Sequence, residues 1–174
     1  MKDKAIPADA STLIYLAKAD AFDEIRNCVP EITVTPAVWH EAVLEGERIG
    51  APEVPRIVEA ARAGGLRRVE LSSHEQATAD SIAAEHRLGR GESEVLALGI
   101  GIGRAIVDEG RASRVAEALG VFPLSTLFLP VLGRRGGRLD EDQAVHLLRR
   151  LAVVTGATAE VVFAIEERLK EGTQ

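Results

Sequence analysis

The most informative stretch for the fold is A105-I-V-D-E-G-R-A-S-R-V-A-E-A-L-G120. It begins with a short apolar run that is typical of a buried parallel strand. Two acidic residues, Asp108 and Glu109, end that strand. A helical pattern follows and stops at Gly120. A strand, a polar turn and a helix in this order make the repeating unit of a parallel α/β sheet.

The same alternation extends outward from this stretch over residues 4–133. Short strands are expected at 6–8, at 31–36 and in the LRRVEL run from residue 66, with helices between them. Pro7 is unfavourable inside a central strand because it cannot donate a ladder hydrogen bond. The helix that begins at Pro36 is expected to end at Gly46. The sequence therefore predicts an α/β fold with a central parallel sheet covered on both faces.

The GRRGGR run at residues 133–138 is the best candidate for a boundary. We expect one domain at 1–133 and a C-terminal helical extension at 134–174. Two helices fit residues 140–153 and 157–170, and their apolar faces predict that the extension packs on the core.

Composition limits the function classes. The 174 residues are 46% hydrophobic, which supports a packed core, and the single Cys28 excludes an internal disulfide and a cysteine-rich zinc site. No apolar run approaches the roughly 20 residues that span a bilayer, and the first residues lack a signal-peptide core. We therefore expect a cytoplasmic protein without a membrane partner. The net charge of −6 disfavours nucleic-acid binding by charge alone, although arginines flank the acidic segments.

Carboxylates recur at the junctions of the expected elements. Asp9 and Asp108 follow strands, Glu109 follows Asp108, Glu41 lies on an early helix, and Glu92 opens a later one. The carboxyl ends of parallel strands meet at one edge of a sheet, where ligands bind. Clustered carboxylates repel one another unless a cation neutralises them. Each position also has an ordinary explanation as a turn, cap or surface residue, and their joint occurrence favours a site for Mg²⁺ or Mn²⁺.

Glu94 lies two residues after Glu92, which is roughly 200° around a helix. The two side chains therefore do not share one site, and one of them is expected to face solvent. A dinucleotide-binding loop at G99-I-G-I-G-R104 is excluded because the run precedes its strand instead of following one.

Four segments together resemble the PIN-domain nucleases, and among them the VapC-type toxins. They are D9-A-S-T-L-I-Y-L-A, the Glu41 helix AVWHEAV, G-E92-S-E-V-L-A-L, and I-V-D108-E109 with its following helix. The resemblance covers roughly residues 4–133 and selects Glu92 over Glu94. Glu replaces the commoner Asp at positions 92 and 109, and S125-T-L-F stands where related sequences often carry a small turn with glycine.

The resemblance implies a PIN-like three-layer α/β/α fold and metal-dependent hydrolysis of RNA phosphodiester bonds. Asp9, Glu92, Asp108 and Glu109 would hold Mg²⁺ or Mn²⁺, and Glu41 would complete the shell or orient the attacking water. Ser11 would hydrogen-bond a ligand carboxylate or a substrate phosphate. The implied partners are an RNA substrate, an antitoxin protein and a second copy in a homodimer. Two alternatives stay open: a PIN-like protein-binding module with weak or no activity, and a metal-dependent phosphatase on a similar sheet.

Overall fold

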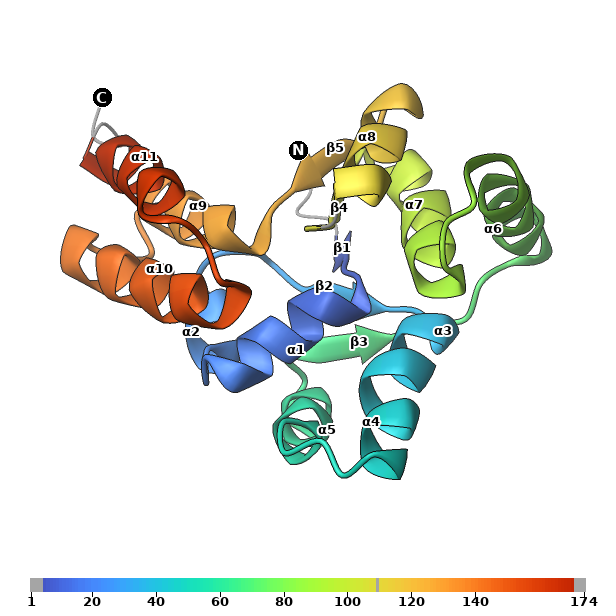
Figure 1. The fold of residues 1–174 in the computed structure, drawn as a ribbon, viewed down its shortest axis with the longest axis horizontal. Helices are drawn as coiled ribbons and strands as arrows, with labels where there is room; N and C mark the ends of the chain where they lie inside the picture. The colour runs from blue at the N-terminus through green and yellow to red at the C-terminus, as the bar shows by residue number, and fades with distance from the viewer. Residues whose placement is uncertain (1–4, 109, 171–174) are drawn as a thin grey trace.

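A parallel sheet lies at the centre of the molecule, between two groups of helices (Figure 1). The computed structural model describes residues 5–108 and 110–170. In the view of Figure 1, α6, α7 and α8 lie to the right and α9, α10 and α11 to the left. This arrangement confirms the predicted three-layer α/β/α fold.

Among the residues that the structure describes, five short strands form the sheet in the order β3-β2-β1-β4-β5. The first three pair in parallel, β4 pairs in parallel with β5, and a parallel bridge between Ala8 and Ile106 joins the two parts. Their bounds are β1 (Ile6–Pro7), β2 (Ile32–Val34), β3 (Leu66–Arg68), β4 (Arg104–Ile106) and β5 (Phe122–Leu124). The central position of β1 and β4 brings Asp9 and Asp108 to the same edge.

Pro7 lies inside the central strand β1, a position at which the sequence analysis found proline unfavourable. The amides of Ile6 and Ala8 bond to β2, donating to Glu31 O at 2.8 Å and to Thr33 O at 3.2 Å. The nitrogen of Pro7 therefore faces β4, because successive amides of a strand alternate in direction. Proline donates no hydrogen bond there. The sheet is accordingly divided at this seam into three strands and two.

The helices alternate with the strands as expected, and several begin at a side-chain cap. Asp9 caps α1, Ser72 forms a capping box with Glu75 at α6, and Asp140 does the same with Gln143 at α10. The helical segments are α1 (Ala10–Lys18), α2 (Phe22–Ile25), α3 (Pro36–Trp39), η1 (His40–Leu44), α4 (Glu45–Arg48), α5 (Val54–Arg62), α6 (Ser73–His86), α7 (Arg90–Ile102), α8 (Gly110–Ala118), η2 (Thr126–Phe128), α9 (Leu129–Arg135), α10 (Glu141–Thr155) and α11 (Ala159–Lys170).

The prediction that Gly46 ends its helix is wrong. The helical segment that begins at Pro36 continues through a π-helical turn at His40–Leu44 to Arg48. Gly46 lies within it, and a Cβ at that position would come within 2.6 Å of Val54 Cγ2. Close packing against Val54, and not a helix stop, therefore accounts for glycine here.

The C-terminal helices pack on the core. Leu147, Leu148 and Leu151 of α10 are almost fully buried, and α10 contacts α1, α9 and η2. Leu169 of α11 is buried in the same cluster. Within residues 5–108 and 110–170, the helices are all too short or too polar to cross a membrane.

Candidate functional site

Asp9 is a buried carboxylate at the end of β1. Its side chain is 3% exposed and its Oδ1 accepts three hydrogen bonds, from Ser11 Oγ at 2.9 Å, Thr12 N at 2.8 Å and Thr12 Oγ1 at 2.7 Å. Ser11 thus contacts a carboxylate, which is one of the two contacts that the sequence analysis proposed for it. Burial raises the pKa of Asp9 above its ordinary value, these bonds oppose the rise, and the charge of Asp108 adds to it.

Asp108 occupies the matching position at the end of β4. Ser125 Oγ and Thr126 N both donate to its Oδ1 at 2.8 Å, and Thr126 Oγ1 donates to its Oδ2. Ser125 and Thr126 follow β5, the neighbouring strand. The loop after one strand therefore orients the carboxylate at the end of the next.

The two aspartates are connected through threonine hydroxyls. Thr12 Oγ1 lies 3.2 Å from Thr126 Oγ1, so a continuous chain runs from Asp9 through both threonines to Asp108. Both threonines are fully buried. The sequence analysis missed their role, although a signal was present: an aspartate or strand end is followed by the pair Ser-Thr at both 11–12 and 125–126.

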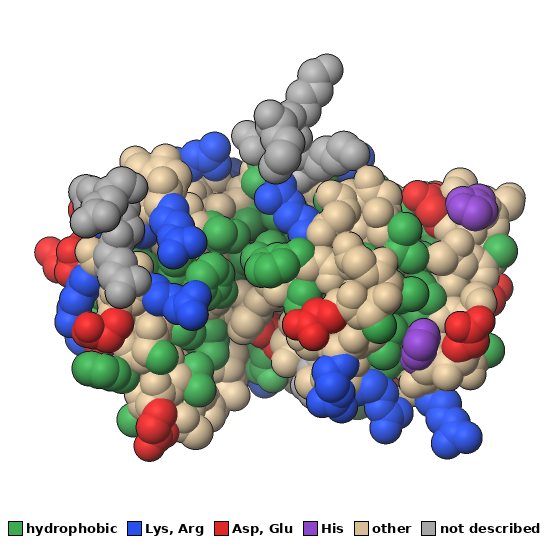
Figure 2. Space-filling view, turned by 90° about the horizontal axis from the view of Figure 1, so that it is seen from above, with side chains coloured by type: hydrophobic (Ala, Val, Ile, Leu, Met, Phe, Trp, Pro, Cys, Tyr) green, Lys and Arg blue, Asp and Glu red, His purple; other side chains and the backbone are tan. Residues whose placement is uncertain are grey.

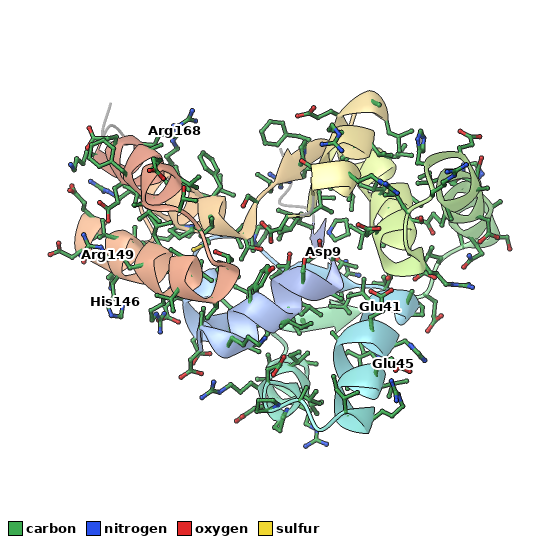
Figure 3. All side chains as sticks on the ribbon, in the orientation of Figure 1. Asp9, Glu41, Glu45, His146, Arg149 and Arg168 are labelled. Atoms are coloured by element: carbon green, nitrogen blue, oxygen red, sulfur yellow. The ribbon has the colours of Figure 1, made fainter. Side chains whose placement is uncertain are left out.

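Glu41 lies on the π-helical turn, beside the first turn of α7. Gly91 N donates to its Oε1 at 3.4 Å. Although the residue as a whole is exposed, partial burial of its carboxylate raises the pKa of Glu41, and the charges of Glu92 and Glu94 add to this effect. Figure 3 shows Glu41 on the helical segment next to the start of α1, where Asp9 lies.

Glu94 is the buried acid of α7. It is 2% exposed, and its Oε2 accepts a hydrogen bond from Ala37 N at 2.9 Å, while Arg90 Nε donates to its Oε1 at 3.1 Å. The sequence analysis left Glu94 outside the site. That expectation is wrong for its placement, because the inner face of α7 packs on α3 and carries Glu94 with it.

Glu92 is half-buried at the start of α7 and accepts a hydrogen bond from Gly89 N at 2.8 Å. It acts as the cap of its own helix, as the ordinary explanation for a carboxylate in a first turn predicts. Glu92 and Glu94 therefore point in different directions, as the helix geometry required. The sequence analysis assigned Glu92 to the site, but in the structure Glu92 caps its own helix.

A pocket of about 520 Å³ opens beside these glutamates. Its walls include Glu41, Glu94, Arg90, His40 and Gln76. It lies between the α3–η1 segment, the loop before α6 and the start of α7. Polar and acidic side chains thus line a hollow that is large enough for part of a ligand.

The donor set suits a hard divalent cation. Carboxylate oxygens are the ligands that Mg²⁺ prefers, often one or two carboxylates with water. Every hydrogen bond that described residues give to the Asp9 carboxylate goes to Oδ1, so Oδ2 is free of that set of donors. Within the part of the chain that the structure describes, three or more acidic, histidine or cysteine side chains do not converge at metal distance. Glu109, the remaining expected ligand, lies outside the described residues.

Figure 2 shows the molecule from above, with basic side chains on both sides of a central region where hydrophobic side chains reach the surface.

One comparison with known proteins gives a match. The family model DUF3368: PIN domain matches residues 5–157, from the start of β1 through α10. No curated protein and no solved structure matches the chain.

Proposed function

The chain belongs to the PIN-domain family, which indicates a nuclease-type function, and from this premise we propose that it is an endoribonuclease dependent on Mg²⁺ or Mn²⁺. The observation that carries the proposal is the pair Asp9 and Asp108. They lie at the ends of adjacent parallel strands and are linked through Thr12 and Thr126. Burial and the charge of Asp108 both raise the cost of ionising Asp9, and a cation offsets that cost.

Asp9 and Asp108 would hold the ion, and their hydroxyl and amide donors keep both carboxylates in place. When bound, the ion would supply Lewis-acid activation of water and offset negative charge on the phosphodiester. Ser11, which is partly buried, helps to fix Asp9 through its hydrogen bond to Oδ1. Glu109 remains a proposed further ligand.

Glu41 is the proposed group that orients the attacking water and accepts its proton. Its raised pKa brings the carboxylate nearer to the range in which a general base works at neutral pH. Gly91 N holds Oε1, so Oε2 is the oxygen that we assign to the water.

In our proposal Glu94, and not Glu92, lies beside Glu41 as the second acidic residue of the pocket wall. Its carboxylate joins α7 to the N-terminus of α3, and its partner Arg90 lies on the rim of the same pocket as Glu41. Arg90 is exposed, so its guanidinium can contact substrate phosphate while it also donates to Glu94. Glu92, whose charge also faces Glu41, is assigned to the cap.

A cleavage assay tests the proposal. Purified protein is incubated with end-labelled single-stranded RNA and with matched DNA, with Mg²⁺, with Mn²⁺ or with EDTA, beside the variant Asp9→Asn. We expect RNA cleavage that needs the ion and is lost in the variant. Cleavage that survives in Asp9→Asn or in EDTA would exclude this site. A chain that is inert toward every RNA would favour the alternative of a protein-binding module.

The toxin role, the antitoxin partner and the homodimer stay predictions that rest on the resemblance to VapC-type toxins. Induced expression in a bacterial host tests the first of them. The wild-type chain should arrest growth and Asp9→Asn should not. Equal growth at equal protein levels would contradict a toxin that acts through this site.

A further inference from the structure

Gly91 lies in the first turn of α7 and is buried. Its φ is not among the positive values of the chain, so the backbone there is open to any L-residue. Glycine within a helix is less stable than alanine by roughly 0.5–1 kcal/mol. The fold alone would therefore favour alanine at this position.

The space beside Gly91 explains why a side chain is absent. A Cβ at position 91 would lie 2.8 Å from Glu41 Oε2 and 3.1 Å from both Glu41 Cδ and Oε1. The atoms in conflict are the far end of one flexible side chain. The backbone could therefore accept alanine, and the Glu41 carboxylate would have to move.

Glu41 and Glu94 connect the two helical segments in both directions. Gly91 N at the start of α7 donates to Glu41, and Ala37 N at the start of α3 donates to Glu94 of α7, at 2.9 Å. Each segment thus binds the carboxylate of the other at its N-terminal end, where negative charge is favoured. The close contact with Gly91 therefore determines where the Glu41 carboxylate lies.

We propose that Gly91 is a positioning residue, and that its missing side chain creates the space in which the Glu41 carboxylate is held for catalysis. The inference rests on the proposed function, because it assumes that Glu41 acts in RNA cleavage. It goes beyond that function in assigning a role to a residue without a functional side chain.

The test compares Gly91→Ala with Gly101→Ala. Both glycines lie in α7, but a Cβ at position 101 would meet nothing within 4 Å. We expect both variants to be at least as stable as the wild type in urea unfolding. Gly91→Ala should lower kcat by about tenfold to a hundredfold, as a small misplacement of a catalytic group does, and Gly101→Ala should keep the wild-type kcat.

A double-mutant cycle with Glu41→Gln identifies the pathway of the effect. If Gly91 acts through Glu41, Gly91→Ala should cause little further loss once the Glu41 carboxylate is gone. Fully multiplicative losses would overturn the proposal, and so would a wild-type kcat in Gly91→Ala.

An NMR titration of the Glu41 side-chain carboxyl carbon separates this inference from the proposed function. The signal is assigned by its loss in Glu41→Gln. Gly91→Ala should shift its titration midpoint and Gly101→Ala should not, whether or not the protein cleaves RNA. Unchanged titration in Gly91→Ala would overturn the positioning role. Failure of wild-type cleavage together with a shifted titration would overturn the nuclease proposal and the catalytic purpose of the Glu41 position, but not the control that Gly91 has over that position.

Discussion

Thr12 and Thr126 are 114 positions apart in the chain, and their hydroxyl oxygens lie 3.2 Å from each other between two aspartates. Thr12 gives its one hydroxyl proton to Asp9, while Thr126 lies within hydrogen-bond distance of both Thr12 Oγ1 and Asp108 Oδ2 and has one proton for these two acceptors. The two hydroxyls therefore lie as a connection between the two acids.

Removing the Thr126 hydroxyl should destabilise the protein. Thr126→Val keeps the shape of the side chain but deprives the Asp108 carboxylate of a donor, which costs about 1.5–3 kcal/mol for a charged acceptor. Urea unfolding measures the change. Thr33→Val is the matched control, because Thr33 Oγ1 is buried and makes no hydrogen bond with the described residues. That variant should be neutral or more stable, and equal losses in both would contradict the assigned role.

The two glutamates of α7 should differ in their effect on cleavage. Glu94→Gln removes the charge of the buried acid and should reduce kcat by about a hundredfold. Glu92→Gln should keep most of the activity, since glutamine can still accept the cap hydrogen bond from Gly89 N. Steady-state kinetics on one RNA substrate compares them. A larger loss in Glu92→Gln would restore the assignment made from the sequence.

Stability should depend on pH through Asp9. Its pKa in the folded protein is raised above the ordinary value of 3.8, so the folded state holds the proton more tightly than the unfolded state. The free energy of unfolding therefore falls as pH rises from 3.8 through the folded pKa. In EDTA, Asp9→Asn should gain stability relative to wild type across that window and differ little below it. A constant difference from pH 3 to 8 would show that Asp9 does not titrate abnormally.

Divalent ions should offset the free-energy cost of ionising Asp9 in the folded protein. A ligand at a hundred times its Kd stabilises a folded protein by about 2.7 kcal/mol. Mn²⁺ should therefore raise the Tm of the wild type, but not that of Asp9→Asn or Asp108→Asn. Asp80→Asn, at an exposed carboxylate on α6, is the control and should respond like the wild type. A rise of equal size in all four proteins would mean that the ion binds elsewhere.

Cys28 should be inert in the folded state. Burial raises the pKa of its thiol to about 12, so the reactive thiolate is scarce at neutral pH. A disulfide reagent such as DTNB should react only at the rate of unfolding, and at the ordinary rate in urea. Rapid reaction of the native protein would contradict the buried placement.

The sequence predicted the parts of the site that depend on local order. Asp9 and Asp108 follow apolar strands, and parallel strands bring such positions to one edge, so their proximity followed from the alternation of elements. The α/β fold was predicted correctly for the same reason, and the PIN-domain family was predicted correctly from the resemblance of four segments to it.

The orientations of Glu92 and Glu94 could not be predicted from local order. Helix geometry separates Glu92 from Glu94, but it does not tell which side of α7 meets α3, since that depends on packing between segments more than fifty residues apart. The π-helical turn that carries Glu41 was also unpredictable, because neither proline nor an internal glycine marks its start. The threonine bridge likewise joins residues whose contact depends on the strand order.

Pro7 has a mechanical consequence for ligand binding. The seam between β1 and β4, where proline leaves the ladder incomplete, separates the strand that carries Asp9 from the strand that carries Asp108. A cation held by both acids would connect β1 to β4 across this seam of the sheet. Ion binding should then slow amide exchange at Asp9, whose N–H donates across the seam to Ile106 O at 3.1 Å, more than at Ala8, which donates to β2.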